Sequence, residues 1–210
     1  MALVIPKHAL LFFTIAMAAA GMARASDPDI LSDFILPPNT TSNLAINGTY
    51  FTYSGLRPVI EIGSIPAFTA IKATAAEFPA LSGQSVSFAA LLYPSGSVNP
   101  PHTHPRSAEL LFLASGYLEV GFVDTTNKLY TQTLQAGDMF VFPKGLLHYQ
   151  YCSSSRGPAI AISAFGSASA GTVSVPGGVF TSGIDVGILA KSFKTDAATI
   201  EKLKAGLAPK

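Results

Sequence analysis

Short apolar runs separated by turn residues make up most of the chain between residues 84 and 165. Pro, Gly, Asp, Asn and Ser gather between the runs, as in Pro94-Ser95-Gly96, where these residue types favour tight turns. We predict strands at 84–93, 109–114, 117–123, 128–134, 139–142, 146–151 and 159–165. Short strands at this spacing are typical of an all-β sandwich or barrel.

Two of the predicted strands are apolar at successive positions, at 110–113 and 139–142. A strand with one buried face alternates apolar and polar residues, so a continuous apolar run indicates burial on both faces. We expect the second face to be covered by a second sheet or by another subunit.

The apolar period becomes helical after residue 183. A first short helix is expected to carry Ile184, Ile188 and Phe193 on one side. A second helix is expected to start at the N-cap Thr195 and to bury Ile200 and Leu203 before it ends near residue 206.

The first 25 residues have the pattern of a secretory signal peptide. Lys7 precedes an uncharged run over 9–23, and the small-residue site Ala23-Arg24-Ala25 comes before Ser26. The run is shorter than the roughly 20 apolar residues that a membrane span needs. We therefore predict a secreted chain of one domain over 26–210, with an extension at 26–57, a barrel at about 58–182 and helices at 183–210.

Two glycosylation sequons fit an extracellular location, at Asn39 and Asn47. Cys152 is the only cysteine, so no intrachain disulfide can form although an oxidising compartment permits one. Stability must come from the core, from a metal or from assembly with other chains.

Composition narrows the classes of partner. The chain has 13 Lys and Arg against 12 Asp and Glu, which leaves no basic field for nucleic acid. Its 49% hydrophobic and 12% charged residues argue against disorder and against a coiled coil. No segment after the leader could span a membrane.

The histidines provide the main chemical clue. His8 belongs to the predicted leader, so the mature chain keeps His102, His104 and His148. An extended backbone turns side chains two residues apart to the same side, and Glu109 opens the next strand. Three imidazoles and one carboxylate form a mixed N/O site suited to a divalent transition metal. Scattered surface or core histidines are the alternative, but every mature histidine falls within this one candidate site.

Serine hydrolase chemistry is excluded. The glycines and serines at 166–171 lack the G-x-S-x-G spacing, and no mature histidine is free to serve a triad.

Two groups of residues resemble the paired motifs of plant germin-like proteins, in the cupin superfamily. The first group comprises Gly96, His102, His104, Pro105, Arg106, Glu109 and Gly116, and the second comprises Gly137, Pro143, Gly145 and His148. The similarity covers essentially the whole mature chain.

The resemblance implies a cupin jelly-roll β-barrel with short C-terminal α-helices. It implies one manganese ion per subunit, held by His102, His104, Glu109 and His148. It also implies an apoplastic or cell-wall location and a homohexamer built as a trimer of dimers. Ligand types alone leave iron, copper and zinc open.

The chain departs from the family pattern at three places. Most of the family carries two N-terminal cysteines that form a disulfide, whereas segment 33–36 of this chain has no cysteine, so that disulfide is missing. Cys152 stands where the family tends to have an amide; it is redox-active or, as we favour, a buried small apolar residue. Oxalate-oxidising germins resemble this chain at Asn99 but hold the dicarboxylate with a second Asn, where this chain has Ala89.

These features favour superoxide dismutation by the metal site, with a role in cell-wall redox chemistry or defence. Oxalate oxidation is weakened by Ala89, and a nucleotide-sugar phosphodiesterase activity finds no Gly-rich phosphate loop to support it. The alternative outside enzymes is a binding protein for a small ligand such as auxin, or a structural protein of the wall.

Overall fold

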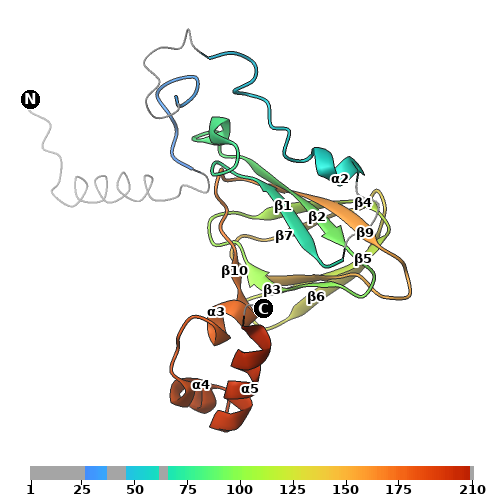
Figure 1. Ribbon diagram of the computed structural model, residues 1–210, viewed down its shortest axis with the longest axis vertical. Helices are drawn as coiled ribbons and strands as arrows, with labels where there is room; N and C mark the ends of the chain where they lie inside the picture. The colour runs from blue at the N-terminus through green and yellow to red at the C-terminus, as the bar shows by residue number, and fades with distance from the viewer. Residues whose placement is uncertain (1–26, 37–45, 62–65, 209–210) are drawn as a thin grey trace, which may run out of the picture.

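The computed structural model describes residues 27–36, 46–61 and 66–208. Two five-stranded antiparallel sheets face each other (Figure 1), and the core lies between them. The first sheet has the order β1 (Thr69–Ala73), β2 (Ser87–Tyr93), β9 (Ala159–Phe165), β4 (Glu109–Ser115) and β7 (Met139–Phe142). The second has the order β10 (Val173–Ser174), β3 (Val98–Thr103), β8 (Leu147–Tyr151), β5 (Tyr117–Val123) and β6 (Leu129–Gln135).

The chain passes repeatedly from one sheet to the other, which makes the fold a jelly roll. Sharp turns make these crossings possible. Gly116 joins β4 to β5 at φ +84°, where a Cβ would lie 2.5 Å from the carbonyl oxygen of Pro158. A side chain at this position would therefore strain the backbone and collide with the neighbouring loop.

The core fills the space between the sheets. On β4 and β9, buried side chains alternate with more exposed ones, as the period of two requires, whereas successive residues of β2 are buried. The largest fully buried side chains of the core include Tyr93, Leu111, Leu113, Leu118, Val120 and Phe142. Cys152 is also fully buried, and its thiol donates to the carbonyl oxygen of Gly157 at 3.1 Å. The prediction of a buried position is therefore confirmed, and burial raises the pKa of this thiol.

Of the two covers predicted for the second face of 110–113 and 139–142, a second sheet is not found within the described part of the single chain. Leu110, Phe112, Met139 and Val141 point away from the second sheet and are 37–57% exposed. The second sheet covers only one face, because alternate side chains of a strand must point in opposite directions. Cover by another subunit stays a prediction.

Of three C-terminal helices, the first lies against β3 and β10, and the other two pack beyond it, apart from the sheets (Figure 1). The three helices are α3 (Val175–Phe180), α4 (Val186–Ser192) and α5 (Ala197–Leu207). The sequence does not predict α3, because Pro176-Gly177-Gly178 has the composition of a turn. The remaining short elements are α2 (Arg57–Glu61) and the 3₁₀ turn η2 (Pro79–Leu81). None of the helices in the described part of the chain has the length and apolar character needed to cross a bilayer.

The details of α4 and α5 correct the sequence-based prediction. Asp196, and not Thr195, is the N-cap of α5, since its carboxylate accepts from the Thr199 amide at 2.9 Å. Ile200 is buried as predicted, whereas Leu203 is exposed. In α4 the buried residue is Leu189, and Ile188 lies on the exposed side.

Candidate metal centre

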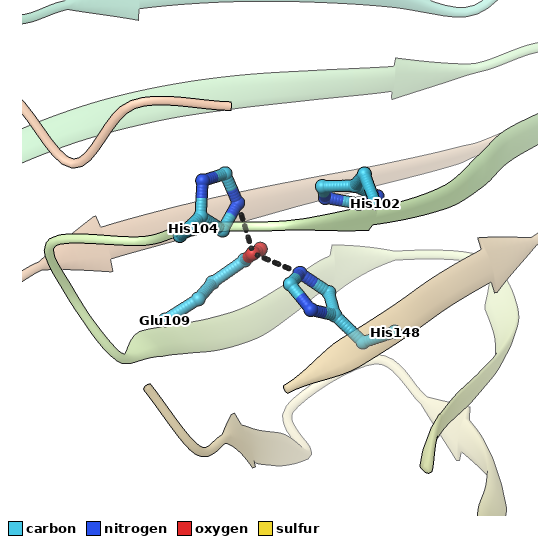
Figure 2. Close-up of side chains that lie close together, drawn as sticks. All are labelled: His102, His104, Glu109 and His148. Atoms are coloured by element: carbon cyan, nitrogen blue, oxygen red, sulfur yellow. Dashed lines mark hydrogen bonds and ion pairs between the residues drawn. The ribbon is translucent and has the colours of Figure 1, made fainter. Parts of the chain in front are cut away.

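The two sheets bring the four predicted ligands to one place. His102 in β3 lies directly opposite His148 in β8, and His104 follows within two residues. Glu109 is the first residue of β4 in the other sheet. The potential ligand atoms all lie within 4.8 Å of one another, and Figure 2 shows the four side chains converging. Each of these residues is 6% exposed or less.

A backbone carbonyl orients each imidazole. The Nδ1 atoms of His102 and His148 lie 2.8 Å from the carbonyl oxygens of Pro100 and Leu146. The Nδ1 atom of His104 lies 2.5 Å from the carbonyl oxygen of Gly171. A carbonyl oxygen only accepts hydrogen bonds, so each Nδ1 must carry its proton and donate it. In the neutral ring Nε2 then keeps a free electron pair, which is the form that binds metals.

Burial keeps the His102 ring neutral. Removal from water, reinforced by the charge of His148, lowers the pKa of His102 to about 4. At neutral pH this ring is therefore available as a ligand.

Glu109 supplies the carboxylate. Burial alone would raise its pKa, but when His104 and His148 carry a second proton on Nε2, their hydrogen bonds to the carboxylate outweigh burial and lower the pKa to about 2. Its Oε2 lies 3.0 Å from Nε2 of His104 and 3.2 Å from Nε2 of His148 (Figure 2). Its Oε1 accepts from the hydroxyl of Ser163 at 2.5 Å.

This geometry fits a bound cation. When Nδ1 holds the only ring proton, the electron pairs of the Nε2 atoms face a carboxylate oxygen 3.0–3.2 Å away. Electron-pair donors at this distance need a shared cation, which is either additional protons on the rings or a metal ion. Three imidazole nitrogens and one carboxylate oxygen, without a thiolate, suit a divalent transition metal.

A cavity of about 340 Å³ reaches the site, and its lining includes His102, His104 and Glu109. Much of the remaining wall is apolar, with Phe68, Leu91 and Phe165 among the lining residues. The site is therefore accessible to a small molecule while its ligands stay buried.

Asn99 and Ala89 also line this cavity. The Asn99 amide donates to Oε1 of Gln150 at 2.7 Å. Asn99, the one amide that this chain shares with oxalate-oxidising germins, is therefore hydrogen-bonded within the protein. Ala89 is 4% exposed and offers no polar group to a ligand. The cavity wall thus lacks the second amide, in agreement with the sequence.

Ser163 contacts the candidate ligand Glu109 and was not predicted from the sequence. It is fully buried on β9 at an inward position, between Ala161 and Phe165. A single polar residue on the inward side of an otherwise apolar strand was the available clue, because buried hydroxyls need a partner.

The predicted surface modifications can be placed only in part. Asn47 is exposed, and its side-chain oxygen accepts from the Thr49 amide at 2.9 Å. Asn39 and the predicted leader lie outside the described residues.

A jelly roll with three histidines and one glutamate gathered inside it defines a cupin. Residues 62–201 match the family described as Cupin. The chain is 57% identical over 205 residues to Germin-like protein 9-3 of Oryza sativa subsp. japonica, a match that covers 95% of each chain. It is 36% identical over 199 residues to Germin-like protein subfamily 2 member 2 of Arabidopsis thaliana, covering 89% of this chain and 90% of the relative.

Among solved structures, the chain is similar to recombinant oxalate oxidase in complex with glycolate. The identity is 31% and the TM-score is 0.77, and the match covers 87% of this chain and 98% of that one. The chain belongs to the germin-like proteins of the cupin family.

Proposed function

We propose that this germin-like protein is secreted, holds one manganese ion per subunit and dismutates superoxide. The ligands are His102, His104, Glu109 and His148. The observation that carries the proposal is the meeting of their ligand atoms within 4.8 Å at the end of a cavity open to small molecules. Manganese follows from the family resemblance together with a donor set of nitrogen and oxygen only.

Bound manganese would supply a metal that can alternate between two oxidation states, as conversion of two superoxide ions and two protons into oxygen and hydrogen peroxide requires. The protein's own part is to hold the ligands and to admit a small anion. The carbonyls at Pro100, Leu146 and Gly171 fix the rings. Superoxide is diatomic, so the cavity needs no elaborate recognition of it.

Oxalate oxidation is the second candidate, favoured by the structural similarity to an oxalate oxidase. A dicarboxylate needs placed donors at both ends, and here Ala89 offers none while Asn99 donates to Gln150. A missing hydrogen bond to a charged group weakens binding by about 1.5–3 kcal/mol. We therefore rank oxalate below superoxide as a substrate.

Assembly and location complete the proposal. The exposed apolar side chains of β4 and β7, with those of α4 and α5, are surfaces that a homohexamer would cover. The leader pattern and the two sequons support an extracellular protein of the cell wall. In the alternative outside enzymes, the same barrel binds a small ligand such as auxin or serves the wall as a structural element.

Metal analysis of the purified mature protein, followed by superoxide and oxalate assays on the same sample, tests the proposal. We expect about one manganese per chain, superoxide dismutation that disappears on chelation, and little oxalate oxidation. Manganese-loaded protein without dismutase activity would overturn the enzymatic part. Failure to bind any transition metal would overturn the site.

A further inference from the structure

His104 depends on a distant part of the chain for its orientation. His102 and His148 each donate from Nδ1 to a carbonyl two residues earlier in the sequence. His104 instead donates to Gly171, 67 residues later, in the segment between β9 and β10. Whatever holds this segment therefore also orients the His104 ring.

The segment 167–171 is held from outside by hydrogen bonds to five successive carbonyls. Their donors come from four residues in three other parts of the chain, and no helix or strand pattern fixes these residues internally. The bonds are Ser87 Oγ to Ser167 at 2.6 Å, the Ala75 amide to Ala168 at 2.8 Å, Arg106 Nε to Ser169 at 2.5 Å, the Arg106 amide to Ala170 at 3.1 Å and His104 Nδ1 to Gly171 at 2.5 Å. The position of the last carbonyl thus depends on the donors that hold the preceding ones, together with the Asp27 carboxylate, which accepts from the Ser167 hydroxyl and the Ala168 amide.

Arg106 is the donor that acts closest to Gly171. Its Nη2 also donates to the Ser169 hydroxyl at 3.1 Å, so the guanidinium donates to both the carbonyl and the hydroxyl oxygen of Ser169. The guanidinium also occupies the space beside Gly171, where an added Cβ would lie 2.8 Å from Nη2. Within 27–36, 46–61 and 66–208, Arg106 forms no ion pair. Its donors serve this segment and not a carboxylate.

We infer that Arg106 is a positioning residue for His104, acting through Ser169–Gly171. Its expected consequence, stronger metal binding, rests on the proposed metal site. A lysine cannot replace the arginine fully, because one ammonium lacks the planar fork that reaches both oxygens of Ser169.

Nuclear magnetic resonance of histidine-labelled, metal-free protein tests the positioning step by itself. In the wild type we expect a protected Nδ1 proton on His104, as on His102 and His148. In Arg106→Ala the His104 proton should exchange with water faster, while the other two stay protected. The control is Arg156→Ala, because Arg156 is an exposed arginine that packs over the Tyr117 ring. Unchanged protection of His104 in Arg106→Ala would overturn the inference.

Manganese titrations in a double-mutant cycle test the consequence. Direct outer contacts to a metal ligand typically change affinity by about 10- to 100-fold. Arg106 acts on His104 through Ser169–Gly171, so Arg106→Ala should weaken binding by up to this factor. The same factor should appear in a His102→Ala background and vanish in a His104→Ala background, since Arg106 then has no ligand to orient. Equal weakening in both backgrounds would show a general structural role and refute the inference.

The two measurements separate failure of the inference from failure of the proposed function. A wild type that binds no manganese refutes the metal site, while the exchange experiment still decides the role of Arg106. If Arg106→Ala does not fold, both measurements are made on Arg106→Lys. We then expect faster exchange of the His104 proton and weaker manganese binding, as for Arg106→Ala.

Discussion

The Ser163 hydroxyl donates to Oε1 of Glu109 at 2.5 Å, across the neighbouring strands β9 and β4. Both residues are almost fully buried. The bond leaves Oε2 of Glu109 to face the imidazoles of His104 and His148. One hydroxyl thus determines which carboxylate oxygen is presented to a metal.

Replacing Ser163 with alanine should weaken metal binding about 10- to 100-fold, because an outer contact to a ligand is lost. It should also lower the free energy of unfolding of the metal-free protein by about 1–3 kcal/mol, since a buried oxygen loses its partner. Metal titration and denaturant unfolding measure the two effects. Ser153→Ala is the control, because that hydroxyl is bonded only to exposed groups. Equal affinities in Ser163→Ala and wild type would contradict the assigned contact.

Manganese should stabilise the folded protein, since a ligand that binds only the native state shifts unfolding. At one hundred times the dissociation constant the expected gain is about 2.7 kcal/mol. Thermal unfolding with and without manganese should show a higher Tm that a chelator reverses. His148→Ala should lose most bound metal and most of this increase while remaining folded. Full metal occupancy in this variant would argue against the four-ligand site.

Ala89→Asn should raise oxalate oxidation relative to wild type without changing metal content, because it adds an amide donor to the cavity wall. The added hydrogen bond should strengthen oxalate binding about ten- to a hundredfold. Ala70→Asn is a matched control, since Ala70 lines the same cavity but is exposed. Steady-state assays on manganese-loaded protein measure the change. Strong oxalate oxidation by the unmodified protein would show that Ala89 is no obstacle.

A charge on the exposed apolar face of the first sheet should disrupt assembly. Val141 on β7 is 55% exposed in the single chain. Val141→Glu should therefore give smaller particles than wild type by light scattering, because a buried unpaired charge opposes association. Thr131→Glu is the control, as Thr131 is an exposed position on β6 of the other sheet. A wild type that stays monomeric at micromolar concentration would refute the expected oligomer.

Much of the fold could be read from residue patterns. The bounds predicted for β5, β7 and β9 are confirmed, because period-two alternation or a short apolar run between turns marks a strand locally. In contrast, β3 was not predicted, since Pro100 and Pro101 are unfavourable in strands. Tertiary pairing with β8 decides its conformation there.

The sequence by itself determined the identity of the four candidate ligands, because histidine is scarce and its spacing survives in an extended chain. Only the tertiary structure decided how these ligands are held. The hydroxyl that donates to Glu109 belongs to a residue 54 positions away, and the carbonyl that accepts from His104 belongs to a residue 67 positions away. Likewise, the choice of buried face at Leu111 and exposed face at Leu110 depended on where the second sheet packs. Contacts between distant segments leave no local period in a sequence, so folding alone brings such partners together.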